Sequence, residues 1–194
     1  DHITAPLVAF AGPLAFDVSS FAGSGSAASL TVSHTCTGSD LLLVTGVQCR
    51  QNPRPTITGV TYATVAMTQK IAREADDWAA TEDPSQYIYI KTAPATGAND
   101  IVATPSGTVE ICMISSSWTG AAATQSGNTG GGFGQTATVS IDVSSASGEI
   151  VVDFATTDLT DLIIGTGQTS ISSQEVAGWN RYASSYESGV ASVT

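Results

Sequence analysis

The side chains best suited to chemistry in this chain are two histidines and three cysteines: His2, His34, Cys36, Cys49 and Cys112. His34 and Cys36 are two positions apart, so in an extended strand they lie on one face. Such a pair could begin a zinc site, but zinc needs four ligands and the spacing supplies no others. His34 could also serve a serine nucleophile, but no GxSxG turn presents one. We therefore expect no metal, no cofactor and no enzymatic activity.

The cysteine count is odd and shows no paired spacing. This pattern is not that of a disulfide framework. We expect all three cysteines to be small buried apolar residues. A Cys49–Cys112 disulfide is left open, because both residues lie in predicted core strands.

Carboxylates gather at two places. Asp76 and Asp77 belong to an acidic run around Trp78, and Asp158 and Asp161 follow a predicted strand. Calcium prefers oxygen ligands, so both places are candidate calcium sites. Neither has the glycine and terminal glutamate of an EF-hand loop, and a solvated acidic surface is the preferred interpretation.

Aromatic residues alternate with polar ones in the segment GWNRYASSYES. The candidate interface or ligand residues there are Trp179, Arg181, Tyr182 and Tyr186. Exposed aromatic side chains beside arginine and asparagine can stack on sugars or form the centre of a protein interface. The alternative is a long loop that folds back and covers one end of the domain.

The charge balance excludes whole classes of partner. Six Lys and Arg stand against 17 Asp and Glu, which gives a net charge of −11. The six cations are dispersed along the chain, so we expect no nucleic-acid binding. Binding to an anionic membrane surface is disfavoured for the same reason.

Hydrophobic periodicity points to an all-β protein. A 42% apolar content and a mean hydropathy of +0.15 favour a packed fold over disorder. Short alternating segments between turn residues indicate an antiparallel sandwich of about ten strands. The continuous apolar run at 41–49 predicts a central strand. We expect one domain over residues 13–194, preceded by an extended arm at 1–12.

Three segments of the chain share a pattern of core strands and short turns: LTVSHTCTGSDLLLVTGVQCR, ITGVTYATVAMTQK and YIYIKTAPATGANDIVAT. Together they resemble a β-sandwich domain of tailed-phage virion proteins that is also seen in bacterial surface proteins. The resemblance implies a jelly-roll-like fold and a structural role as a capsid decoration or cement protein. Copies of the chain itself and a major capsid or other virion protein would be its partners, on the capsid surface.

The apolar arm suggests how copies could join. Its candidate assembly residues are Ile3, Pro6, Leu7, Val8 and Phe10. An arm of this kind can complete the sheet of a neighbour or grip a capsid. One alternative function is therefore a subunit of an extracellular filament or surface layer joined by donor strands. The other is a carbohydrate- or receptor-binding module with weak glycan binding through the aromatic segment.

Overall fold

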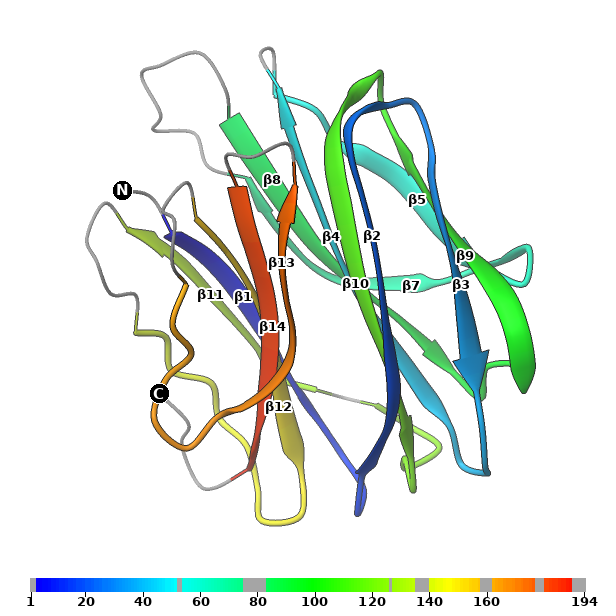
Figure 1. Ribbon diagram of the computed structural model, residues 1–194. Helices are drawn as coiled ribbons and strands as arrows, with labels where there is room; N and C mark the ends of the chain where they lie inside the picture. The colour runs from blue at the N-terminus through cyan, green and yellow to red at the C-terminus, as the bar shows by residue number, and fades with distance from the viewer. Residues whose placement is uncertain are drawn as a thin grey trace.

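The computed structural model describes residues 3–51, 54–74, 83–125, 127–134, 140–157, 162–176 and 180–189. These residues form fourteen strands in three antiparallel sheets (Figure 1). In this part of the chain there is no helix of the length and apolarity needed to cross a membrane. The prediction of an all-β antiparallel sandwich is confirmed, with more strands than the ten expected.

Two of the sheets form a jelly roll. The central sheet has the order β2-β10-β4-β8-β7, and the small sheet has the order β3-β9-β5-β6. This alternation of strands between two facing sheets is that of a jelly roll with two Greek keys. The central sheet consists of β2 (Ala15–Ala27), β10 (Val109–Thr119), β4 (Leu42–Gln51), β8 (Asp83–Thr92) and β7 (Thr68–Glu74). The small sheet consists of β3 (Leu30–Cys36), β9 (Gly97–Pro105), β5 (Ile57–Tyr62) and β6 (Val65–Ala66).

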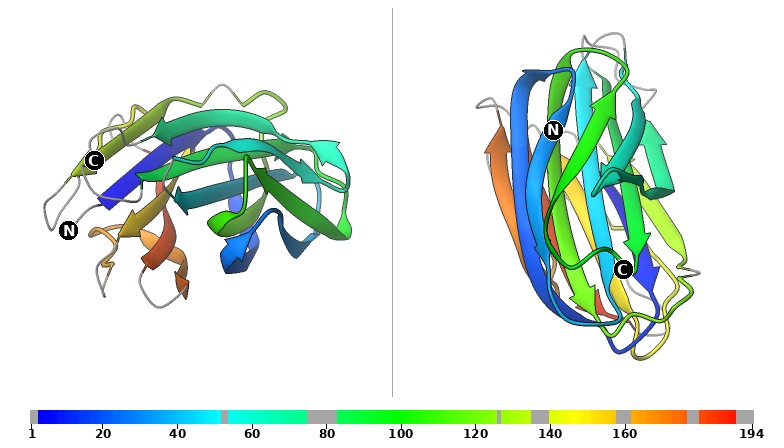
Figure 2. Two further views of the ribbon diagram at one scale, coloured as in Figure 1. Left: turned by 90° about the horizontal axis from the view of Figure 1, so that it is seen from above. Right: turned by 90° about the vertical axis from the view of Figure 1, so that its right-hand side faces the viewer.

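The two ends of the chain build the third sheet, here called the terminal sheet. Its order is β11-β1-β12-β14-β13. Figures 1 and 2 show it on one side of the central sheet, with the small sheet on the other. Its strands are β11 (Thr129–Gly134), β1 (Ile3–Phe10), β12 (Ile150–Thr157), β14 (Asn180–Ser188) and β13 (Thr169–Val176).

The central sheet is buried on both faces, which explains its continuous apolar sequence. In β4, Leu43 and Val47 belong to the core shared with the small sheet. The intervening Leu42 and Val44 belong to the core shared with the terminal sheet. Successive strand residues point to opposite faces, so only a strand with two buried faces needs apolar residues at every position. The prediction of a central strand here is confirmed.

The N-terminal segment is not an arm outside the sandwich, and this corrects the expectation from the sequence. Strand β1 lies between β11 and β12 and pairs with both. Pro6, Leu7, Val8 and Phe10 are all buried, the last two completely. Burying these apolar side chains stabilises the strand by far more than an exposed arm could gain. Ile3 begins β1 and so belongs to the same strand.

The cysteines are buried and free, as expected for small apolar residues. Cys49 belongs to the core beneath the small sheet, and Cys112 belongs to the core beneath the terminal sheet. The two side chains therefore lie on opposite faces of the central sheet. A Cys49–Cys112 disulfide, which the sequence left open, is excluded by this placement.

Candidate functional site

All four arginines of the chain gather at one end of the sandwich, here called the arginine end. Arg50 is on β4 opposite Glu110 of β10, and Arg73 is on β7 opposite Gln86 of β8. Gln86 in turn pairs with Gln48, two residues before Arg50. The remaining two, Arg54 and Arg181, are tied to this end by the contacts described next.

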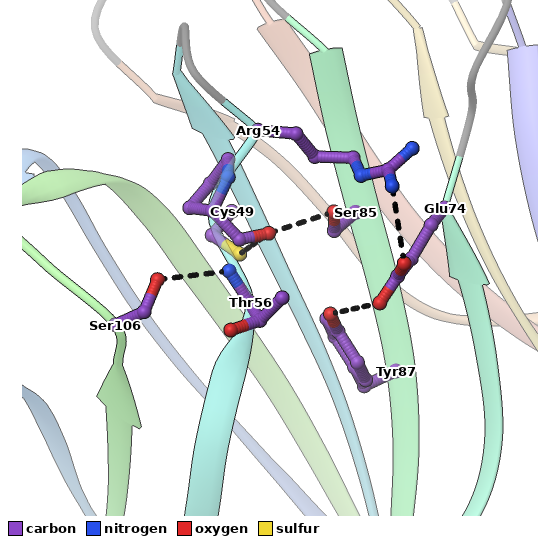
Figure 3. Close-up of polar contacts among 8 residues, drawn as sticks. Cys49, Arg54, Thr56, Glu74, Ser85, Tyr87 and Ser106 are labelled. Carbon is purple, nitrogen blue, oxygen red and sulfur yellow. Dashed lines mark hydrogen bonds and ion pairs between the residues drawn. The ribbon is translucent and has the colours of Figure 1, made fainter.

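Glu74 organises the jelly-roll side of the arginine end (Figure 3). Its carboxylate lies 3.4 Å from the Arg54 guanidinium and accepts a 2.9 Å hydrogen bond from the Tyr87 hydroxyl. Burial, and then the bond to Glu74, raise the pKa of Tyr87. Tyr87 therefore stays protonated and donates, and it is a structural contact rather than an acid or base near neutral pH.

The segment that follows β4 is fixed by three further bonds in Figure 3. The Pro55 carbonyl accepts from Ser85 Oγ at 2.9 Å and from the Cys49 thiol at 3.9 Å. The Thr56 amide donates to Ser106 Oγ at 3.1 Å. Burial raises the pKa of Cys49 to about 12, so this thiol is a weak donor and not a nucleophile.

On the opposite face of the central sheet, three side chains form one row across neighbouring strands. Cys112 pairs with Gln48, and Gln48 pairs with Gln86. Gln86 Nε2 donates to Gln48 Oε1 at 2.8 Å, while Gln86 Oε1 is buried without a partner. Burial raises the pKa of Cys112 well above its usual value, so its thiol is unreactive as well.

A small cavity adjoins this row, between the central and terminal sheets. Besides the row itself, it is lined mainly by Gly46, Ile114, Phe154, Tyr182 and Ala183. Most of the lining residues are apolar, and the two glutamines are the amides among them. A buried amide oxygen that lacks a partner destabilises the fold unless something donates to it.

Tyr182 joins the terminal sheet to the arginine end. Its hydroxyl donates to Glu110 Oε1 at 2.7 Å, and the side chain is only 2% exposed. Burial, followed by the nearby negative charges, raises its pKa strongly. Its neighbour Arg181 forms a 3.3 Å ion pair with Glu175 of β13. The expectation of an exposed Tyr182 on a surface loop is therefore wrong, because residues 180–188 form β14.

Tyr186 lies farther along the same strand in a cluster of three rings. Its ring is 4.9 Å from that of Trp118, at 81°. Phe16 lies 5.4 Å from Trp118 and is almost parallel to Tyr186, with an interplanar angle of 3°. Trp118 is fully buried and Phe16 is 41% exposed, so Phe16 and Tyr186 cover the indole. Trp179, the other predicted aromatic, lies outside the described residues.

His34 and Cys36 lie inside the jelly roll. His34 Nδ1 is 2.8 Å from Ser20 Oγ, and burial lowers its pKa. The carboxyl of Asp17 also has a lowered pKa. Burial alone would raise this pKa, but hydrogen bonds from Thr37 and Ser117 outweigh the effect of burial. A Ser20–His34 contact thus exists that the sequence analysis did not identify. With His34 only 2% exposed, this contact is closed to a substrate from solvent.

The other feature is Asp153, a carboxylate near the second acidic cluster whose burial the sequence did not lead us to expect. It accepts bonds from Ser185 Oγ at 2.6 Å and from Gln168 Nε2 at 2.8 Å. Burial raises its pKa to about 6 despite the bonds from Ser185, and Glu187 adds to the increase. The signal was its position inside an apolar strand, IVVDF, where a single acid must be buried on one face.

The four aspartates predicted as calcium candidates lie outside the described residues. They are Asp76, Asp77, Asp158 and Asp161. Within the described ranges, no three His, Cys, Asp or Glu residues come together in a way that could hold a metal ion. The calcium proposal therefore stays a prediction from sequence.

Comparison with known proteins yields no relative. No family model, no curated protein and no solved structure matches this chain. The resemblance to virion domains therefore rests on the sequence segments alone.

Proposed function

We propose that this protein is a non-enzymatic structural subunit of a virus particle, a decoration or cement protein that binds a capsid. The jelly roll is the observation that supports this function most directly. The three segments that resemble tailed-phage virion domains contain β3, β5 and β6 in full, most of β4 and β9, and parts of β7 and β8. Jelly rolls are a common architecture of viral capsid domains, and the step from fold to role is one of analogy.

The packing suits a rigid subunit that contacts its neighbours, and not a protein that encloses a substrate. The central sheet is buried on both faces, and each core is filled with side chains such as Leu43 and Leu42. Close-packed interiors deform little under load. A rigid body repeated by symmetry stabilises a shell through many modest interfaces, since binding to the assembled state favours that state.

The surface chemistry agrees with use at high copy number. The net charge of −11 keeps copies apart in solution until a specific contact forms. At the arginine end each of two arginines is neutralised by a glutamate, Arg54 by Glu74 and Arg181 by Glu175. This end therefore carries charges of both signs and does not form a basic patch for nucleic acid.

The test is the protein content of particles. We expect mass spectrometry of virions from the source of this chain to find it in stoichiometric ratio to the shell protein. Purified protein added to particles stripped of it should bind and raise the temperature at which the shell opens. Absence from purified particles would contradict the proposal. Long polymers of the protein alone would favour a filament or surface layer, and glycan binding by a monomer would favour a binding module.

A further inference from the structure

We propose that β1 is an exchangeable strand, so that β1 of one chain can fill the place between β11 and β12 of a second copy. This goes beyond the proposed function, because it concerns contacts between copies of this chain whatever else they bind. Four features of β1 support it: a glycine-rich neighbour, an interrupted ladder, contacts that a second copy could reproduce, and a tight hinge.

The neighbour on one side, β11, has almost no side chains. Ala5, Pro6 and Leu7 of β1 lie opposite Gly132, Gly131 and Gly130. Cross-strand side-chain pairs normally specify which strands pair and in which register. A glycine-rich strand lacks them, and such strands are prone to alternate pairing and to exchange between chains.

The ladder on the other side, with β12, is interrupted. It pairs Thr4 with Thr156 and resumes only at Leu7 with Asp153. Pro6 lies in the gap, and proline has no amide hydrogen to donate to a ladder. Proline is unusual within a strand that has neighbours on both sides. The backbone bonds that keep β1 in its own sheet are therefore fewer than its length allows.

The apolar contacts of β1 do not depend on which chain supplies the strand. Val8 and Phe10 are fully buried in the core between the terminal and central sheets. The same side chains on the β1 of a second copy would fill the same space. Exchange of an identical strand thus keeps these side chains buried. The free energy of exchange therefore depends mainly on the hinge and on the protein concentration.

The hinge between β1 and β2 is short and tight. Gly12 has a φ of +122°, and a β-carbon there would overlap the carbonyl oxygen of Gly120. The Leu14 amide donates to the Gly12 carbonyl at 2.8 Å, so the chain reverses within three residues around Pro13. Short hinge loops under strain favour exchange, because the exchanged form lets the hinge extend.

Cysteine cross-linking between two different chains tests the proposal directly. Ala9 and Val151 are opposite each other in the β1–β12 ladder. Chains carrying Ala9→Cys are refolded at high concentration with chains carrying Val151→Cys and are then oxidised. Exchange predicts a covalent heterodimer on a non-reducing gel. The matched control pairs Val151→Cys with Thr31→Cys, a position on β3 of the small sheet, and should give none.

A hinge variant and a locked variant complete the test. Gly12→Ala should shift the equilibrium about tenfold toward the exchanged form, since alanine is strained at a positive φ. Gly97→Ala, at φ +85° in a turn away from β1, should leave the equilibrium unchanged. A chain with both Ala9→Cys and Val151→Cys, oxidised as a dilute monomer, should fail to associate in light scattering. Circular dichroism checks that every variant folds.

The proposal fails if the mixed chains give no heterodimer above the control. It also fails if the locked chain associates as well as the wild type does. Either result would show that β1 stays in its own sheet, whether or not the protein binds a capsid.

Discussion

Phe154 of the terminal sheet lies directly on Gly46 of the central sheet, so that a β-carbon at residue 46 would overlap the phenyl ring. Gly46 is on β4, next to Ile114 of β10, and Phe154 is on β12. No other residue type lets the ring approach the sheet this closely. The contact sets the distance between the two layers beside the cavity.

We expect Gly46→Ala to destabilise the protein by about 1–3 kcal/mol, because the added methyl group forces Phe154 and its sheet outward. Urea unfolding at neutral pH measures this loss. Gly59→Ala is the matched control, since a β-carbon there meets nothing within 4 Å. Equal effects of the two substitutions would show that the close approach of Phe154 is unimportant.

The β5–β6 hairpin turns on two residues that both have left-handed backbone conformations. Ala63 has a φ of 49° and Thr64 a φ of 67°, as a two-residue type I′ turn requires. A β-branched residue is strained there, so Thr64→Gly should stabilise the protein by about 1 kcal/mol. Thermal unfolding measures the gain. Thr61→Gly, within β5, should instead destabilise, and a loss of stability in Thr64→Gly would refute the assignment.

Removing the Tyr182 hydroxyl should loosen the terminal sheet. Tyr182→Phe deletes the 2.7 Å bond to Glu110 and should cost about 1.5–3 kcal/mol, the range for a bond to a charged group. Tyr186→Phe is the matched control, because the contacts of Tyr186 are made by its ring. Hydrogen exchange of β14 should rise in the first variant only. No difference between the two would contradict the role of the Tyr182 hydroxyl.

Asp153 should make stability fall as the pH rises. Its pKa is raised from 3.8 to about 6 in the folded protein, so folding favours the protonated form. The contribution of Asp153 to the free energy of unfolding is fully present below pH 3.8 and is lost as the pH rises through about 6. Over this range the shift in the pKa lowers the free energy of unfolding by about 3 kcal/mol. Urea unfolding between pH 4 and pH 7 measures it.

Asp153→Asn should flatten this part of the stability profile, because asparagine does not titrate. His34→Gln is the comparison of opposite sign. Burial lowers the pKa of His34 below 6.5, so its contribution is present above pH 6.5 and is lost as the pH falls through its folded-state pKa. A profile for Asp153→Asn that parallels the wild type would show that Asp153 does not titrate in this range.

The aromatic segment shows what the sequence analysis overlooked. Tyr182, Ser184 and Tyr186 alternate with small residues, which is the period of a strand. Taken as a strand, this period places both tyrosines on one face, and the structure buries that face against the central sheet. From the sequence we expected either an exposed ligand-binding segment or a loop folded back over one end of the domain. Neither expectation identified the strand β14 that this segment forms.

Local pattern determined the fold class, the continuous apolar β4 and the burial of the cysteines, because side-chain period and hydropathy act within a few residues. Only the tertiary structure decided that β1 joins strands more than 100 residues away, and that four dispersed arginines meet at one end. These choices depend on contacts between distant segments, whose free energies are summed over whole interfaces. No local period in the chain specifies which strand an apolar segment will pair with.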